Sequence, residues 1–170
     1  MRRLGMLWVC GTTAVALSGC GQGGPTAPAA TADCGQVDFP GLQSGSHLIG
    51  DIEPPVPYNS TPPTSGWHRS GAPPAGVFSE PLPEPAQVST LEAGGVVVTY
   101  HDLADEDLQM LQDMVRTRYA DRVALTSYDA IEPGSIAFTS WGALQHCDAL
   151  DLDALDSYVA DYASPIEVHS

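Results

Sequence analysis

The sequence predicts an α+β fold, in which a small β-α-β-β-α scaffold is covered by a long Pro-rich irregular segment. Thirteen of the fifteen prolines lie between residues 21 and 90, where we therefore expect no regular helix. After residue 95, β-branched runs alternate with stretches in which apolar residues recur at helical spacing. The irregular part still carries aromatic and aliphatic side chains, so we expect it to be ordered and packed on the scaffold.

The scaffold begins with a strand and a helix. Val96–Tyr100 is a β-branched run that follows Gly94 and Gly95, and this pattern predicts a strand. Residues 103–120 have the apolar spacing of a helix, with Asp102 as a candidate N-cap. Acidic residues crowd the first turn of this helix and arginines its last turn, which matches the helix dipole.

Two further strands and a second helix complete the scaffold. We expect the strands at residues 122–128 and 135–141, joined by a turn that contains Pro133 and Gly134, and the helix at residues 150–162. Because a short helix separates the first two strands of the scaffold, we expect these two strands to be parallel, with a right-handed crossover.

Residues 1–19 have the features of a lipoprotein signal peptide. Two arginines precede an apolar run that is too short to span a membrane, and the run ends in Leu17-Ser18-Gly19-Cys20, which resembles the bacterial lipobox. This resemblance implies cleavage before Cys20 and acylation of its thiol, for example with palmitate. We therefore expect an exported protein that its lipid anchors to the cell membrane or envelope. The alternative is an ordinary secretory signal in which this cysteine is incidental.

The mature chain divides into a tether and one domain. Residues 20–33 hold the cysteine for lipidation and a Gly-, Ala-, Thr- and Pro-rich stretch typical of a flexible tether, and residues 34–170 form a single globular domain. Cys34 and Cys147 are the two cysteines left in the mature chain, and outside the cytoplasm such a pair predicts a disulfide. Two separate thiols, or a metal-binding pair of His146 and Cys147, are the alternatives.

The charge of the chain excludes two classes of partner. It has 21 acidic residues against six arginines and no lysine, and its formal net charge is -15. Binding to nucleic acid needs clustered basic residues that neutralise phosphates, so we expect no nucleic-acid partner. The same balance argues against electrostatic docking on anionic lipid. The expected contact with a membrane is therefore through the N-terminal lipid.

Candidate functional side chains are most concentrated in residues 58–68, which have the sequence YNSTPPTSGWH. Its two prolines fix φ, Gly66 can adopt a positive φ, and the neighbouring hydroxyls can bond locally, so the stretch can hold Trp67 and His68 in one orientation. It resembles the Y-x-x-x-PPTSG-x-H signature of the bacterial family called domain of unknown function 3105. Residues 91–96 resemble the H-x-LEHGGV box of that family, and residues 135–142 resemble its strand ending in Trp-Gly. The motif residues are Tyr58, Pro62, Pro63, Thr64, Ser65, Gly66, Trp67, Gly94, Gly95 and Trp141.

The resemblance implies a metal site built from histidines, and this chain departs from the family pattern there. The two histidines of the H-x-LEHGG box fall on Ser89 and Ala93. His47, His68 and Glu92 remain as candidate ligands, and two imidazoles with one carboxylate can hold a divalent cation. Because the histidines are far apart in the sequence and two ligands are lost, we expect weak binding of divalent metal or none. The alternative is that the two remaining histidines are hydrogen-bonded partners inside the Pro-rich segment.

These features favour a non-enzymatic lipoprotein of the cell envelope that acts as a binding or interaction module, with a protein or small-ligand partner and no cofactor. A protein that binds or handles a divalent metal of the copper type is the alternative. An envelope enzyme is the least favoured class, since no set of nucleophile, base and orienting residue is visible. His101, at a strand end, and His146, in an expected loop, are weaker candidates for chemistry.

Overall fold

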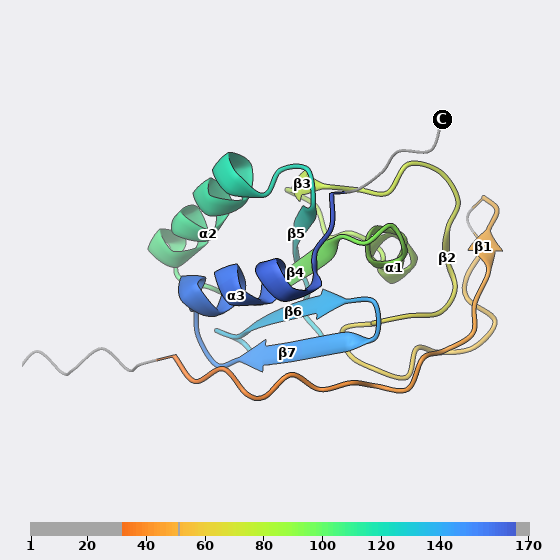
Figure 1. Cartoon of the computed structure of the whole chain (residues 1–170), viewed down its shortest axis with the longest axis horizontal. Helices are drawn as coiled ribbons and strands as arrows, with labels where there is room; N and C mark the ends of the chain where they lie inside the picture. Colours follow the sequence, from red (N-terminus) through yellow and green to blue (C-terminus); the bar gives the residue numbers. More distant parts are fainter. Residues whose placement is uncertain (1–31, 51, 166–170) are drawn as a thin grey trace, which may run out of the picture. The chain divides into compact units, whose positions relative to one another are not determined.

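A five-stranded mixed sheet carries the fold, and its strands lie in the order β3-β5-β4-β6-β7 (Figure 1). The computed structural model describes residues 32–50 and 52–165, which belong to one compact unit. β5 pairs in parallel with both β3 and β4, whereas the β4/β6 and β6/β7 pairs are antiparallel. The strands are β3 (Gly76–Val77), β4 (Val96–Tyr100), β5 (Val123–Ser127), β6 (Ile136–Ser140) and β7 (Ala143–Cys147).

Three helices cover the two faces of this sheet: α1 (Glu84–Glu92), α2 (Asp105–Arg118) and α3 (Leu152–Tyr162). Val96 and Val98 of β4 pack with α2 and α3 in the main core, while Val97 packs with Leu91 of α1 on the opposite face. Because both faces are covered, β4 reads as a continuous apolar run rather than an alternating one.

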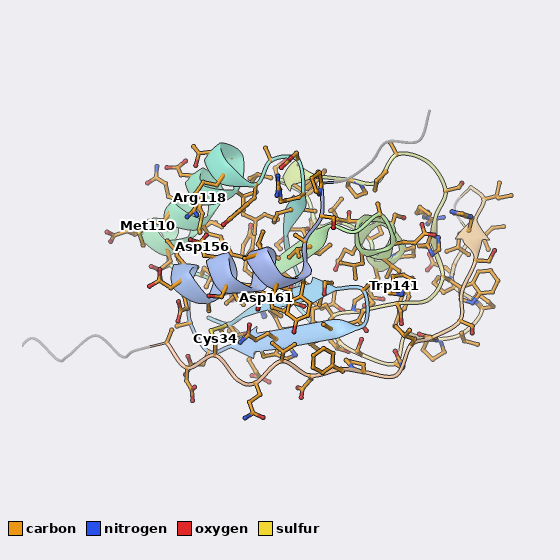
Figure 2. All side chains as sticks on the ribbon, in the orientation of Figure 1. Cys34, Met110, Arg118, Trp141, Asp156 and Asp161 are labelled. Atoms are coloured by element: carbon orange, nitrogen blue, oxygen red, sulfur yellow. A yellow bond between two sulfur atoms is a disulfide. The ribbon has the colours of Figure 1, made fainter. Side chains whose placement is uncertain are left out.

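An ion pair and a hydrogen bond join the end of α2 to α3. Arg118 lies 2.9 Å from a carboxylate oxygen of Asp156, and the Tyr119 hydroxyl donates a hydrogen bond to the same carboxyl group (Figure 2). The hydrogen bond from Tyr119 and the charge of Arg118 together lower the pKa of Asp156. This polar contact supplements the apolar packing of the two helices.

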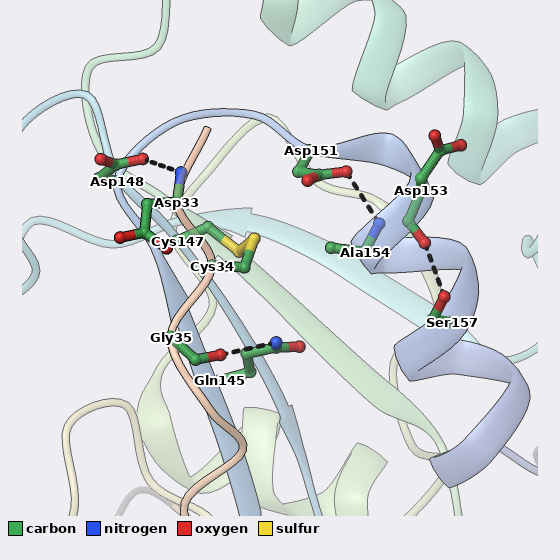
Figure 3. The surroundings of a disulfide bond; sticks show 10 residues. All are labelled: Asp33, Cys34, Gly35, Gln145, Cys147, Asp148, Asp151, Asp153, Ala154 and Ser157. Atoms are coloured by element: carbon green, nitrogen blue, oxygen red, sulfur yellow. Dashed lines mark hydrogen bonds between the residues drawn. A yellow bond between two sulfur atoms is a disulfide. The ribbon is translucent and has the colours of Figure 1, made fainter. Parts of the chain in front are cut away.

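The N-terminal part of the chain runs along β7 before it reaches the small sheet of β1 (His47–Leu48) and β2 (His68–Arg69). Asp38 exchanges two backbone hydrogen bonds with Leu144, and Gly35 donates one to His146. The Cys34–Cys147 disulfide closes the start of this path, at the end of β7 (Figure 3). The predicted disulfide is confirmed, and the alternatives of two free thiols or a His146–Cys147 metal pair are wrong.

The α+β class and most of the expected elements are confirmed. The strand at Val96–Tyr100, the helix that follows it and its parallel pairing with β5 are all present. The strand expected at 135–141 corresponds to β6, and the helix expected at 150–162 begins at Leu152, where the Asp151 side chain accepts a hydrogen bond from the Ala154 amide.

Three expectations about the elements are wrong. α1 is a regular helix inside the Pro-rich part, because Pro85 lies in its first turn, where an absent N–H costs nothing. β7 was not expected, and it places His146 in a strand rather than a loop. Asp102 does not cap α2, since Ala104 is the N-cap and the backbone of Asp102 has a φ of 48°.

Several expectations concern residues outside the described part. The signal peptide, the lipidation of Cys20 and most of the tether fall on residues 1–31, and they stay predictions. Across residues 32–50 and 52–165, we find no helix with both the length and the apolar character needed to span a membrane.

Candidate functional site

The signature stretch at residues 58–68 is folded by hydrogen bonds between side chains and the backbone. The Tyr58 hydroxyl donates to the carbonyl of Trp67, and Ser65 Oγ accepts the Gln43 amide at 2.8 Å. Burial, together with the charge of Glu84, raises the pKa of the Tyr58 phenol well above its ordinary value, so the phenol remains a donor. These bonds fix the backbone directly before His68.

Two chain segments approach closely at this point, and glycine makes the approach possible. A Cβ on Gly45 would lie 2.0 Å from the carbonyl carbon of Gly66, which has a φ of +120°. The close approach allows the short parallel pairing of β1 with β2, in which His47 and His68 are register partners. Residues that are distant in the sequence are thus placed side by side.

Helix α1 brings the third side chain to the pair of histidines. Ser89 Oγ lies 2.9 Å from the carbonyl oxygens of both Arg69 and Pro85, and the hydrogen bond from its single proton to Arg69 joins the helix to β2. Glu92 is the last residue of α1 and lies one turn beyond Ser89. Its carboxylate therefore faces the imidazoles of β1 and β2.

The three side chains form a compact cluster. Glu92 Oε2 lies 3.2 Å from His68 Nε2 and 4.0 Å from His47 Nε2. The ligand atoms of all three lie within 4.8 Å of one another. The His68 side chain is 6% exposed, whereas those of His47 and Glu92 are 58% and 46% exposed. Within residues 32–50 and 52–165, no other group of three or more His, Cys, Asp or Glu meets this geometry.

The hydrogen bond of the His68 ring decides which nitrogen is free. Nδ1 lies 2.9 Å from the Gly66 carbonyl oxygen, which can only accept, so Nδ1 carries the proton. In the neutral ring, Nε2 then presents a lone pair. This nitrogen is buried without a hydrogen-bond partner, because the nearby Glu92 oxygen is close but not aligned for a hydrogen bond. With the ring in this neutral form, two acceptors face each other, and a cation between them would satisfy both.

The motif residues beyond the cluster shape its surroundings. Gly94 has a φ of +88° and its amide caps α1, while the Gly95 amide bonds the Thr90 carbonyl. Trp141 lies at the turn between β6 and β7, with its indole centroid 6.5 Å from that of His68 and the planes at 84° (Figure 2). The amide of the next residue, Gly142, donates to the Thr64 carbonyl at 3.0 Å, which links this turn to the signature stretch.

The other candidate residues lie apart from the cluster or are already paired. The Ser89 hydroxyl is occupied by two carbonyls, and Ala93, the C-cap of α1, offers no ligand. His101 Nδ1 lies 2.6 Å from the Ile131 carbonyl, and its Nε2 lies 3.6 Å from Asp102. The alternative interpretation, a hydrogen bond between His47 and His68, does not describe their contact. Their rings stand edge to face instead, with centroids 4.6 Å apart.

Together, the fold and the cluster define an α+β domain with a candidate three-ligand metal site at the edge of its Pro-rich part. A family model described as "Protein of unknown function (DUF3105)" matches residues 51–169, which is more than half of the chain, so the chain belongs to this family. No curated protein and no solved structure matches the chain.

Proposed function

We propose that this protein is an exported, lipid-anchored member of its family whose domain binds a divalent transition-metal ion through His47, His68 and Glu92. The observation that carries the proposal is the buried Nε2 of His68, which has no hydrogen-bond partner and faces a carboxylate. The proton on Nδ1 is held by a backbone carbonyl, which is the usual arrangement around an imidazole that ligates a metal through its other nitrogen.

The expectation of weak or absent metal binding depended on two arguments, and one of them no longer applies. The β1–β2 pairing places His47 beside His68, although nothing local in the sequence ensures that the two histidines meet. The other argument, the loss of two histidines at Ser89 and Ala93, still limits the protein ligands to three. A tight site is therefore compatible with a coordination position left open.

The kind of donor atoms narrows the choice of metal. The cluster offers two imidazole nitrogens and one carboxylate oxygen, and Cys34 and Cys147 are consumed by their disulfide. Such a set suits Zn²⁺ or Cu²⁺, whereas Cu⁺ prefers thiolate and thioether ligands. We therefore favour a divalent ion over a role in the handling of Cu⁺.

Isothermal titration with Zn²⁺ and Cu²⁺ at moderate salt tests the site. We expect one equivalent of metal to bind with micromolar or tighter affinity and His68→Ala to abolish this binding. His101→Ala is the matched control, because this histidine also bonds a backbone carbonyl but lies outside the cluster. Binding that His68→Ala leaves unchanged, or no stoichiometric binding by the native chain, would refute the proposal.

The anchor is tested separately. Cys20→Ser should release the protein from membranes into the soluble fraction, because the acyl chains supply the membrane affinity. A variant that stays bound after a high-salt wash would show that the lipobox interpretation is wrong. The binding or interaction role expected from the sequence remains a second candidate, favoured by exposed apolar side chains of the N-terminal segment and of the β6–β7 turn. These are Phe39, Leu42, Ile49, Ile52, Val56 and Trp141.

A further inference from the structure

We infer that the metal at His47, His68 and Glu92 keeps one coordination position open, and that this position binds a small carboxylate ligand whose apolar part packs on Trp141. The inference depends on the proposed metal site and deepens it, since it assigns a class of ligand to the site. It follows from the number of protein ligands, their exposure, their charge and the side chains beside them.

The number of ligands leaves a position free. Zn²⁺ takes four ligands in most protein sites, and sites with three protein ligands hold water or substrate at the fourth. In the part of the chain that the structure describes, only His47, His68 and Glu92 bring ligand atoms within common reach of an ion. Ser89, one turn before Glu92 on α1, offers only a neutral hydroxyl, a much weaker metal ligand than imidazole or carboxylate, and its proton points at backbone carbonyl oxygens.

The exposure of the ligands shows on which side the free position lies. His68 forms a buried inner wall, while His47 and Glu92 form an outer rim that is about half exposed. An ion between them is thus covered by protein on the His68 side and reaches solvent past the other two side chains. A ligand from solution can enter there without any rearrangement of the chain.

The charge of the occupied site favours an anion. A divalent ion with one carboxylate and two neutral imidazoles carries a net charge of about +1. The rest of the chain is strongly acidic, so this is a local positive centre on a negative surface. A carboxylate oxygen is also an ordinary fourth ligand for Zn²⁺ and Cu²⁺.

Exposed apolar side chains lie beside His68, at the turn between β6 and β7. The Trp141 side chain is 41% exposed, and its indole lies near the His68 ring. Leu42 packs over the neighbouring turn, since a Cβ on Gly142 would come within 2.8 Å of its Cδ2 atom, and Leu42 is itself exposed. An exposed indole offers a flat apolar face with a high affinity for aromatic groups. The site is therefore suited to a carboxylate that bears an apolar or aromatic group.

Cobalt substitution tests the inference, because the visible absorption of bound Co²⁺ reports its coordination. The purified protein is loaded with Co²⁺ and titrated with acetate and with benzoate. We expect both anions to change the spectrum and benzoate to bind about tenfold more tightly, since its ring gains contact with the indole. Trp141→Ala should remove the advantage of benzoate while the affinities for acetate and for Co²⁺ stay the same. Met110→Ala on α2, a similarly exposed apolar side chain at 44%, is the control and should change nothing.

The outcomes separate this inference from the proposed function. If Co²⁺ binds stoichiometrically but neither anion alters its spectrum, the open position is refuted and the metal site stands. If Co²⁺ does not bind at the cluster, the proposed function fails. Equal affinity for acetate and benzoate, unaffected by Trp141→Ala, would refute the role of the indole.

Discussion

Two regions of this molecule are held together by different forces. The scaffold, residues 84–162, is a sheet in which every residue of β6 is buried and helices pack on both faces. The N-terminal segment, residues 32–83, leaves five large apolar side chains exposed: Phe39, Leu42, Ile49, Ile52 and Val56. It is held by hydrogen bonds from side chains to the backbone, by short strand pairings and by a disulfide. Burial of apolar surface stabilises the first region, and specific polar contacts shape the second.

The candidate site lies where these two regions meet. The N-terminal segment supplies His47 and His68, α1 supplies Glu92, and the β6–β7 turn of the scaffold supplies Trp141. The irregular segment can thus bring distant residues together because the scaffold gives it a fixed surface. Changes in the scaffold should affect both stability and binding, whereas many changes in the segment should affect binding alone.

The largest expected effect is a cavity in the scaffold. Phe138 is fully buried and stacks near Tyr158, with ring centroids 5.7 Å apart. Phe138→Ala should lower the free energy of unfolding by about 3–5 kcal/mol, measured by chemical denaturation. In the segment, Val56→Ala should change it by less than about 0.5 kcal/mol, since this side chain is exposed. Similar losses at both positions would abolish the distinction between the two regions.

The next largest effect concerns the disulfide, which joins the two regions. Its cysteines are 113 residues apart, and loss of such a crosslink costs about 2–4 kcal/mol. In the double variant Cys34→Ser with Cys147→Ser, hydrogen exchange should speed up first at the amides of Gly35 and Asp38, which bond to β7. The amides of β4 and β5 should remain protected, and equal loss of protection throughout would contradict this order.

A smaller effect is expected at alkaline pH. Burial raises the pKa of Tyr158 in the folded protein well above its ordinary value of 10. The unfolded chain releases this proton near pH 10 and the folded chain does not, so the contribution is present below pH 10 and lost as the pH rises. The free energy of unfolding should fall by about 1.4 kcal/mol per pH unit above 10 from this group. Tyr158→Phe should make the profile less steep, since burial also raises the pKa of Tyr58 and Tyr128, and an unchanged slope would refute the assignment.

The smallest expected effect is a gain at the site. Ala93 directly follows Glu92 at the C-cap of α1, and the family pattern has histidine there. Ala93→His should add a fourth ligand and tighten Zn²⁺ binding about tenfold, or about 1.4 kcal/mol. It should also weaken the binding of benzoate, because the new ligand takes the open position. Ala86→His, near the other end of α1, is the control, and equal effects of both variants would argue against the proposed geometry.

The sequence predicts the scaffold better than it predicts the site, for physical reasons. β4 is a β-branched run and α2 has apolar residues at helical spacing, so the local sequence is enough to predict both elements. α1 is masked by the density of prolines, although Pro85 occupies a position that tolerates it. β7 has the mixed composition ALQHC because His146 points to solvent at a surface strand.

The residues of the site can be named from the sequence, but their proximity in space cannot be predicted from it. His47 and His68 come together through a pairing of only two residues per strand, which depends on the close approach of Gly45 to Gly66. No local spacing encodes that contact. The resemblance to the family identified Glu92, and the structure adds the free Nε2 of His68.

Nitrogen NMR of the histidine rings, recorded during a titration with Zn²⁺, tests the central claim most directly. We predict that the Nε2 signals of His47 and His68 shift and saturate at one equivalent, while Nδ1 of His68 keeps its proton and the rings of His101 and His146 do not respond. Shifts that also appear at His101 and His146 and vanish at moderate salt, or an unchanged Nε2 of His68, would contradict the account.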